Sequence, residues 1–497
     1  MKNCLQKKLK LFLYIFLFAF ILFDLSHSFR QYRAHTLDGD IAESVIPYPD
    51  IQKTFDDPIG IKTIINNDKH LGPNRFFAHY FLHITFKKGT LFLQNYFEPI
   101  ESVYLTAAIS KLIIQIAILL LLTTIVAGSF NIFSLKFMIT AAVITPFFLT
   151  NGYGLVRQIG IIDTSVTYTF FYALPLVFLL LYYLPIFFEL LHDKIVKMNG
   201  WMIVLWIIFA IISCFSCPIN PPAIAIINSI LFFSLFIKAW QSNKNYSFQS
   251  RIFISLKKIS RRMCLFLVPI TILALYSTFL GTYNNAFSSI QLPLKQLYSI
   301  LPHGIWKTFT SQGYFILCFL LIINYLIVSL KYSNETQYKR VRGLYQFLII
   351  FSFIYILLLP FGGYRSCRPL LLRYDTLLHI TILSIITISY TIFFISKQLI
   401  KEKWSVLKIA YFTVILMVLT YLVIKDEIYV YNDCEKASLH IIANSEEDVV
   451  ALEHNCAVVS WVPIHNPEET SWFKYDELLY LWNITDKPKP YYNLPQP

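Results

Sequence analysis

Three carboxylates lie close together near the start of the chain, in the segment Asp38-Gly39-Asp40-Ile41-Ala42-Glu43, here called the acidic motif. One carboxylate in such a group can accept a proton from a substrate hydroxyl, while another positions the substrate or binds a divalent cation. Reduced solvation beside a membrane raises the pKa of a carboxylic acid toward the range that suits proton transfer. The structural alternative is a helix N-cap at Asp40, with Glu43 completing a capping box.

A second charged segment lies at residues 361–375, between two apolar stretches. Its arginines are Arg365, Arg368 and Arg373. Guanidinium groups bind phosphate through paired hydrogen bonds, and the Gly362-Gly363 pair permits close approach of a ligand to the backbone. The structural alternatives are anchoring in lipid headgroups, ion pairing with the acidic C-terminal segment, or a local pair between Arg373 and Asp375.

Other polar residues are weaker candidates for the same cleft. Arg157 and His303 lie in other loops expected on the same face of the membrane. His79 and His83 have the i, i+4 spacing that can bind a metal, but without a third ligand they are better explained as the polar face of a helix. The sequence does not identify a metal ion or a complete set of ligands for one. Lys111 lies inside an apolar stretch, and its side chain is expected to snorkel toward the membrane surface, with contact to a phosphate as the alternative.

Long apolar stretches must position these groups. The chain has 497 residues, of which 56% are hydrophobic and only 14% charged, against about 25% charged in soluble domains. Stretches of roughly 17 to 25 apolar residues can cross about 30 Å of hydrocarbon. They cover residues 9–26, 104–127, 133–150, 165–189, 200–217, 219–238, 264–282, 313–330, 343–361, 375–396 and 406–424. The sequence therefore predicts an all-α polytopic membrane protein with about eleven transmembrane helices.

The basic residues predict how these helices are oriented. With the N-terminus inside, the inner connections and the N-terminal segment hold 22 lysines and arginines, while the short outer connections hold 6. Because basic residues concentrate on the cytoplasmic side, the N-terminus is predicted inside and the C-terminus outside. The net charge of +13 is explained by this topology, so no nucleic-acid partner is expected. Both the acidic motif and the segment 361–375 fall on the outer face.

Two outer regions are too long to be simple connections. Residues 1–424 are predicted to form the membrane domain, including a first outer loop at 27–103 with interfacial helices, one of them at 74–86. Residues 425–497 are predicted to form a small outer α+β domain, with strands near 439–442 and 457–462 and a helix at 475–482. Cys434 and Cys456 could form a disulfide there, because that compartment is oxidising.

This arrangement resembles the membrane-embedded glycosyltransferases of the GT-C superfold. The resemblance rests on the number of spans, the large first outer loop, the additional outer domain, and the segment Leu37 to Glu43 just after the first span. It implies a single sugar moved from a polyprenyl-phosphate donor to a glycan, lipid or protein, with Asp38 or Asp40 as the base. It also implies that the arginines of 361–375 hold the donor phosphate. From their positions in the chain, Glu43, Asp375, Arg157 and His303 are expected to be further substrate contacts. The chain lacks the WWDYG-type signature of oligosaccharyltransferases, so transfer of a whole oligosaccharide to protein is not supported.

Two other classes of function remain open. A transporter or flippase would place charged groups inside the spans near the bilayer midplane, whereas the predicted spans carry few charges, mostly near their ends. A non-catalytic protein of envelope-polysaccharide assembly would use the C-terminal region as a docking module. For all three classes, we expect a bacterial inner-membrane protein whose functional site faces the periplasm.

Overall fold

The computed structural model describes residues 2–148, 158–243, 246–285, 292–335, 337–364, 368–402, 406–424 and 429–495, with side chains from residue 7 onward. Nine helices within these ranges are long and apolar enough to cross a membrane. They are α1 (Lys2–Ala34), α7 (Pro99–Ala127), α11 (Leu174–His192, preceded by α10, Val166–Tyr168, and η3, Thr169–Ala173), α13 (Asn220–Ser242), α15 (Arg261–Leu280), α17 (Gln312–Lys331), α18 (Tyr338–Leu358), α19 (Leu378–Lys401) and α20 (Val406–Ile424). The protein is an integral multi-pass membrane protein.

Two shorter apolar helices coincide with the remaining predicted spans. They are α8 (Leu135–Ile144, extended by η2, Thr145–Phe148) and α12 (Gly200–Cys214). Helix α12 has 15 residues, fewer than the about 20 that a typical span needs. The helical architecture is therefore confirmed, and nine of the predicted eleven spans reach crossing length. The other helices outside the first outer loop and the C-terminal region are α14 (Phe248–Lys258), α16 (Leu294–Phe309), η4 (Gly281–Tyr283) and η6 (Leu359–Gly362).

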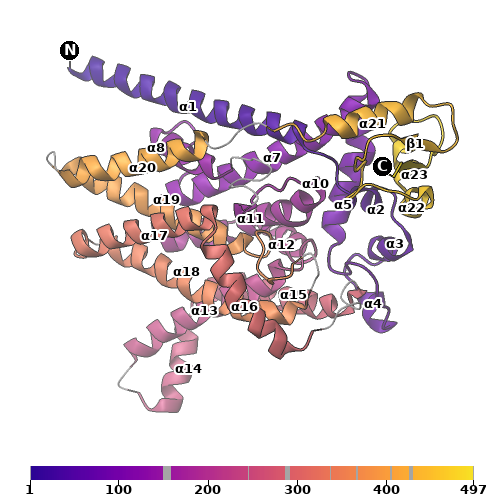
Figure 1. Cartoon of the computed structure of the whole chain (residues 1–497). Helices are drawn as coiled ribbons and strands as arrows, with labels where there is room; N and C mark the ends of the chain where they lie inside the picture. The colour runs from indigo at the N-terminus through magenta and orange to yellow at the C-terminus, as the bar shows by residue number, and fades with distance from the viewer. Residues whose placement is uncertain are drawn as a thin grey trace.

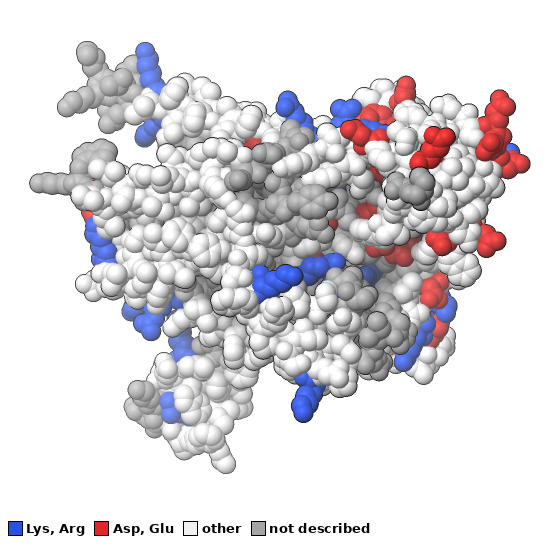
Figure 2. Space-filling model, viewed as in Figure 1, with Lys and Arg blue, Asp and Glu red and all other residues white. Residues whose placement is uncertain are grey.

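The two ends of the molecule differ in charge. The N-terminus and the C-terminal region lie at opposite ends of the helical bundle (Figure 1). Acidic side chains gather at the end formed by the C-terminal region and the first outer loop (Figure 2). This separation agrees with an orientation in which the acidic end is outside the cell, which stays a prediction.

The first outer loop folds into short helices. They are α2 (Ile41–Val45), α3 (Pro49–Asp56), α4 (Ile61–Ile65), α5 (Phe76–Ile84), η1 (Thr85–Gly89) and α6 (Thr90–Leu93). The helix predicted at 74–86 is confirmed as α5, whose buried face includes Ala78, His79 and Leu82. The loop is shorter than predicted at both ends, because α1 continues to Ala34 and α7 begins at Pro99.

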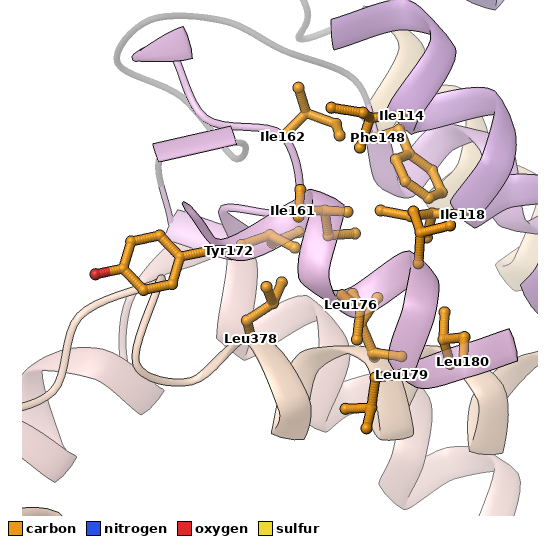
Figure 3. Packing of buried hydrophobic residues seen from close by; sticks show 14 of the residues in the cluster. Ile114, Ile118, Phe148, Ile161, Ile162, Tyr172, Leu176, Leu179, Leu180 and Leu378 are labelled. Carbon is orange, nitrogen blue, oxygen red and sulfur yellow. The ribbon is translucent and has the colours of Figure 1, made fainter. Parts of the chain in front are cut away.

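Helices α7, α11 and α19 form the centre of the bundle and support the outer surface above them. Nearly every residue of α19 from Leu378 to Ile392 is buried. Branched aliphatic side chains of α7, α11 and the preceding loop pack together there, including Ile114, Ile118, Ile161 and Leu176 (Figure 3). The ring of Tyr172 in η3 points away from this aliphatic cluster (Figure 3). The core therefore fixes the backbone of Tyr172, while its hydroxyl lies outside the aliphatic cluster and can make polar contacts.

A polar stripe joins α1 to α7 within the membrane. Its buried members on α1 are Asp24, Ser28, Gln31 and Tyr32, whose spacing places them on one helix face, and the buried His35 follows directly after the helix ends at Ala34. Gln115 of α7 accepts a hydrogen bond from the Tyr32 hydroxyl at 2.6 Å and donates one to the Ser28 hydroxyl at 3.2 Å. Polar contacts of this kind hold membrane helices together.

Lys111 of α7 belongs to the same interface. It is 1% exposed, and its Nζ donates to the Thr164 carbonyl at 2.5 Å. The prediction that Lys111 snorkels to the surface is wrong, because this partner and His35, 3.3 Å from Nζ, take its donors inside the protein. Asp24, ten residues before the end of α1, also departs from the expectation that charged groups of the spans lie near their ends.

The C-terminal region has less β-structure than predicted. It contains α21 (Asp433–Asn444), β1 (Val450–Leu452), α22 (Pro467–Trp472), α23 (Tyr475–Leu481) and β2 (Tyr491–Asn493), with β1 and β2 paired in parallel. Helix α23 confirms the helix predicted at 475–482. The predicted strand at 439–442 is wrong, because Leu439 and Ile442 are buried together on one face of α21. The strand predicted near 457–462 is also wrong, because residues 458–462 form bends. Cys434 and Cys456 form a disulfide.

Candidate functional site

A polar cavity of about 140 Å³ lies where the acidic motif, α5, η3 and residues 368–377, here called the arginine loop, come together. Its charged lining residues are Asp40, Glu43, Arg75 and Arg368. The other lining residues are His79, Tyr168, Phe171, Tyr172, Ile51, Leu71, Gly72 and Asn284. Two carboxylates and two guanidinium groups from distant parts of the sequence therefore share one space.

Asp40 and Glu43 supply the acidic side of the polar cavity. Asp40 is the N-cap residue of α2, but its side chain makes no capping hydrogen bond, so the predicted capping box is absent. Instead, Oδ1 of Asp40 accepts a hydrogen bond from the indole Nε1 of Trp461 at 2.7 Å. Burial, and next the negative charge of Asp40, raise the pKa of Glu43 to about 8. At neutral pH Glu43 is therefore mostly protonated and can donate a hydrogen bond.

Asp38 is turned into the protein. It is 3% exposed and does not line the polar cavity. Its Oδ2 accepts hydrogen bonds from the Ser165 hydroxyl at 2.8 Å and the Thr167 backbone N–H at 3.0 Å, and its Oδ1 accepts one from the Asp40 backbone N–H at 3.2 Å. Asp38 thus ties the acidic motif to the start of the α10–η3–α11 helix.

Arg75 and Arg368 supply the basic side. Arg75 immediately precedes α5, and its guanidinium carbon lies 5.6 Å from the centre of the Phe171 ring. Arg368 donates from Nη2 to the Tyr172 hydroxyl at 2.6 Å. Among the described residues, the buried Nε atoms of both arginines have no hydrogen-bond partner. Both arginines line the polar cavity, so this wall carries positive charge opposite Asp40 and Glu43.

The arginine loop is held by a separate ion-pair cluster. Asp375 accepts from Nε and Nη2 of Arg373 at 2.9 and 2.6 Å, and from Nη2 of Arg368 at 2.6 Å. Burial raises the pKa of Asp375, but the positive charges and hydrogen bonds of the two arginines outweigh it and hold the pKa below its ordinary value. The local pair between Arg373 and Asp375 is therefore present, and Asp375 fixes the position from which Arg368 reaches the polar cavity.

His79 forms part of the cavity wall in its neutral form. Its Nδ1 lies 2.9 Å from the Ser44 hydroxyl, and burial, followed by the charge of Arg75, lowers its pKa to about 3. No group of three or more His, Cys, Asp or Glu side chains suited to a metal ion occurs in the described part of the chain. Asp40 and Glu43 alone are a poor ligand set for a divalent cation, and no chemical step is derived through one.

An apolar cavity of about 390 Å³ lies between α11, α13, α18 and α19. His379 lines it near the start of α19, four residues after Asp375, and Arg340 lines it near the start of α18. Along α11 its lining runs from Leu176 to Leu191, a distance of about 22 Å at the helical rise per residue. An elongated apolar space therefore extends through the helical bundle from a point close to the arginine loop.

Most of the other predicted site residues do not line the polar cavity or lie outside the described residues. Arg157 and Arg365 lie outside the described residues. His303 is exposed on α16 and does not line the polar cavity. Arg373 does not line it either, but its guanidinium carbon lies 5.1 Å from the centre of the Tyr168 ring. Of the predicted residues, the structure thus brings Asp40, Glu43 and Arg368 together around one space.

Sequence reasoning missed Arg75 and Trp461. Arg75 carried a usable signal, because a cation at the beginning of a helix is disfavoured by the helix dipole and so suggests a nearby anion. Trp461 carried none, since nothing in its local sequence relates it to Asp40.

Comparison of the sequence and the structure with protein-family models, with curated proteins and with solved structures found no match. The function is therefore argued from the geometry of the site.

Proposed function

We propose that this protein is a membrane glycosyltransferase that moves a single sugar from a polyprenyl-phosphate donor to a hydroxyl group of a glycan, lipid or protein acceptor. The observation that supports this most directly is the polar cavity, in which Asp40 and Glu43 share one space with Arg75 and Arg368. Sugar transfer from a lipid phosphate needs a group that takes a proton from the acceptor and cations that stabilise the leaving phosphate.

The reaction is a displacement at the anomeric carbon of the donor. The acceptor oxygen forms the new bond to this carbon, and Asp40 takes the hydroxyl proton. The bond from the anomeric carbon to the phosphate oxygen breaks, and its electron pair stays on the phosphate. The guanidinium groups of Arg75 and Arg368, which line the polar cavity, stabilise that charge. Protonated Glu43 donates a hydrogen bond that orients the sugar or the acceptor. Between the two aspartates, Asp40 is assigned as the base because Asp38 is buried and already accepts three hydrogen bonds.

The apolar cavity supports a lipid-linked donor. Its lining is almost entirely aliphatic and aromatic, and one end lies four residues from Asp375, the ion-pair partner of Arg368. A phosphate held by Arg368 would thus have an apolar space beside it for the first isoprene units. A water-soluble nucleotide-sugar donor has no hydrocarbon chain that would occupy such a space.

The test is a transfer assay with the purified full-length protein in lipid nanodiscs and a panel of polyprenyl-phosphate sugars. Asp40→Asn is expected to lower kcat by about 10³-fold, because the amide cannot accept the proton. Arg75→Gln is expected to raise the donor KM by about tenfold or more, as lost charge-assisted hydrogen bonds to phosphate would. Arg33→Gln is the matched control, since Arg33 pairs with Glu101 away from the polar cavity. Full activity in Asp40→Asn would remove the assignment of the base, and absence of transfer in the wild type from every donor would overturn the proposal.

A further inference from the structure

The bend that carries Trp461 lies against the acidic motif, 421 residues away in sequence. The indole Nε1 donates to Oδ1 of Asp40 at 2.7 Å. The indole ring lies 5.5 Å from the ring of Tyr168, which lines the polar cavity and also contacts Arg373. Trp461 therefore touches both the carboxylate side and the aromatic wall of the cavity.

Burial of apolar surface does not by itself determine how the indole is oriented. Trp461 is 50% exposed, and in this half-buried position its single N–H is directed at a carboxylate. A hydrogen bond to an ionised carboxylate is stronger than one between neutral groups and fixes the orientation of the acceptor. The geometry is that of a positioning contact.

The acidic motif is shaped to receive the C-terminal region at Gly39. A Cβ atom at this position would lie 2.8 Å from Cδ1 of Trp461 and 3.0 Å from the Tyr475 hydroxyl. The Tyr475 hydroxyl donates to the Gly39 carbonyl at 3.3 Å. Any side chain at residue 39 would therefore push Trp461 and Tyr475 away from Asp40.

Glu435 of α21 stabilises the contact between the acidic motif and the bend that carries Trp461. Its carboxylate accepts hydrogen bonds from the Leu37 backbone N–H at 3.0 Å, the Tyr104 hydroxyl at 2.7 Å and the Val459 backbone N–H at 2.8 Å. These donors belong to the segment before the acidic motif, to α7, and to the bend before Trp461. The disulfide between Cys434 and Cys456 joins α21 to the segment that leads into that bend. One buried side chain thus fixes the distance between the acidic motif and the bend that carries Trp461.

We infer that the C-terminal region completes the functional site, and that Trp461 is a positioning residue that holds Asp40 in its working orientation. The catalytic meaning of this inference rests on the proposed function, but the positioning itself does not. An accessory docking module would instead leave the polar cavity unchanged when its contacts were altered.

The decisive variant is Trp461→Phe, which keeps an aromatic ring and removes only the N–H donor. Trp472→Phe is the matched control, because Trp472 lies in the same region and is 80% exposed. In the transfer assay, Trp461→Phe is expected to lower kcat about tenfold with the donor KM within twofold. The acidic limb of its pH–rate profile is expected to move to higher pH, because a donor to the charged carboxylate is lost. Tyr475→Phe, a second variant that keeps its ring, is expected to change kcat in the same direction by a smaller factor.

Hydrogen–deuterium exchange supplies a readout that does not depend on catalysis. The amides of residues 37–45 are expected to exchange faster in Trp461→Phe than in the wild type and in Trp472→Phe. Faster exchange in a protein whose wild type transfers no sugar would support the positioning contact and overturn only the proposed function. Unchanged exchange together with unchanged kcat in Trp461→Phe would overturn the inference, as would equal losses of kcat in Trp461→Phe and Trp472→Phe.

Discussion

The arginine loop and the acidic motif meet at the polar cavity but balance their charges differently. In the arginine loop, Asp375 is enclosed by Arg368 and Arg373, and its pKa is held below the ordinary value. In the acidic motif, burial and next the negative charge of Asp40 raise the pKa of Glu43 to about 8. A carboxylate with matched partners stabilises the fold. A carboxylate held near an uncompensated charge is a candidate for proton transfer or ligand binding.

Asp375→Asn is the substitution with the largest expected effect on stability. It removes the charge that compensates two partly buried arginines, and breaking such a pair typically costs about 3–5 kcal/mol. Denaturant titration in mixed micelles measures the loss. Asp40→Asn, titrated in parallel, is expected to lose less than about 1 kcal/mol, because the amide oxygen can still accept from Trp461. Equal losses in both variants would show that the two regions do not differ in the way described.

Glu43→Gln tests the acidic motif through the pH dependence of the protein's stability. The folded protein keeps the Glu43 proton up to about pH 8, whereas the unfolded chain releases it near the ordinary value of about 4.5. Between these values the folded state binds more protons, so the stability contributed by this group falls as pH rises. The difference between unfolding midpoints at pH 5 and pH 8 is expected to shrink in Glu43→Gln. Glu453→Gln, an exposed carboxylate of the C-terminal region, is the control and should leave that difference as in the wild type.

Arg33→Gln should have the smallest effect. Arg33 pairs with Glu101 at 2.6 Å, but its side chain is 50% exposed, and exposed pairs contribute about 0.2–1 kcal/mol. The loss, measured by the same denaturant titration, should decrease further in high salt. A loss as large as that of Asp375→Asn would mean that burial does not separate structural from surface ion pairs in this protein.

The length and apolarity of the stretches were sufficient to predict the nine spanning helices found in the described residues, because the bilayer imposes both properties on a span. The apolar pattern could not predict where the helices end. Helix α1 continues to Ala34 because its polar stripe packs on α7, and the thickness of the bilayer does not determine that contact. The strand predicted at 439–442 failed for a related reason. In so short a segment, alternation cannot be told from the i, i+3 spacing that buries Leu439 and Ile442 on a helix.

The candidate site was partly predictable. The close spacing of three carboxylates and of three arginines pointed to the acidic motif and to Arg368, and Asp40 and Glu43 do share a cavity with Arg368. The separate surroundings of Asp38 and Asp40 could not be foreseen, since they depend on Ser165, Thr167 and Trp461. Contacts between residues hundreds of positions apart leave no local pattern in a single sequence.

The hydrogen bond from Leu37 to Glu435 also has a consequence for the order of biosynthesis. The two residues are 398 positions apart, so at 5–20 residues per second the ribosome makes the acceptor roughly 20–80 s after the donor. During that interval the acidic motif exists without the partner that shapes it. A chain truncated before Glu435 would lack the acceptor for the Leu37 N–H, so we expect the acidic motif to reach its final arrangement only after α21 has been synthesised.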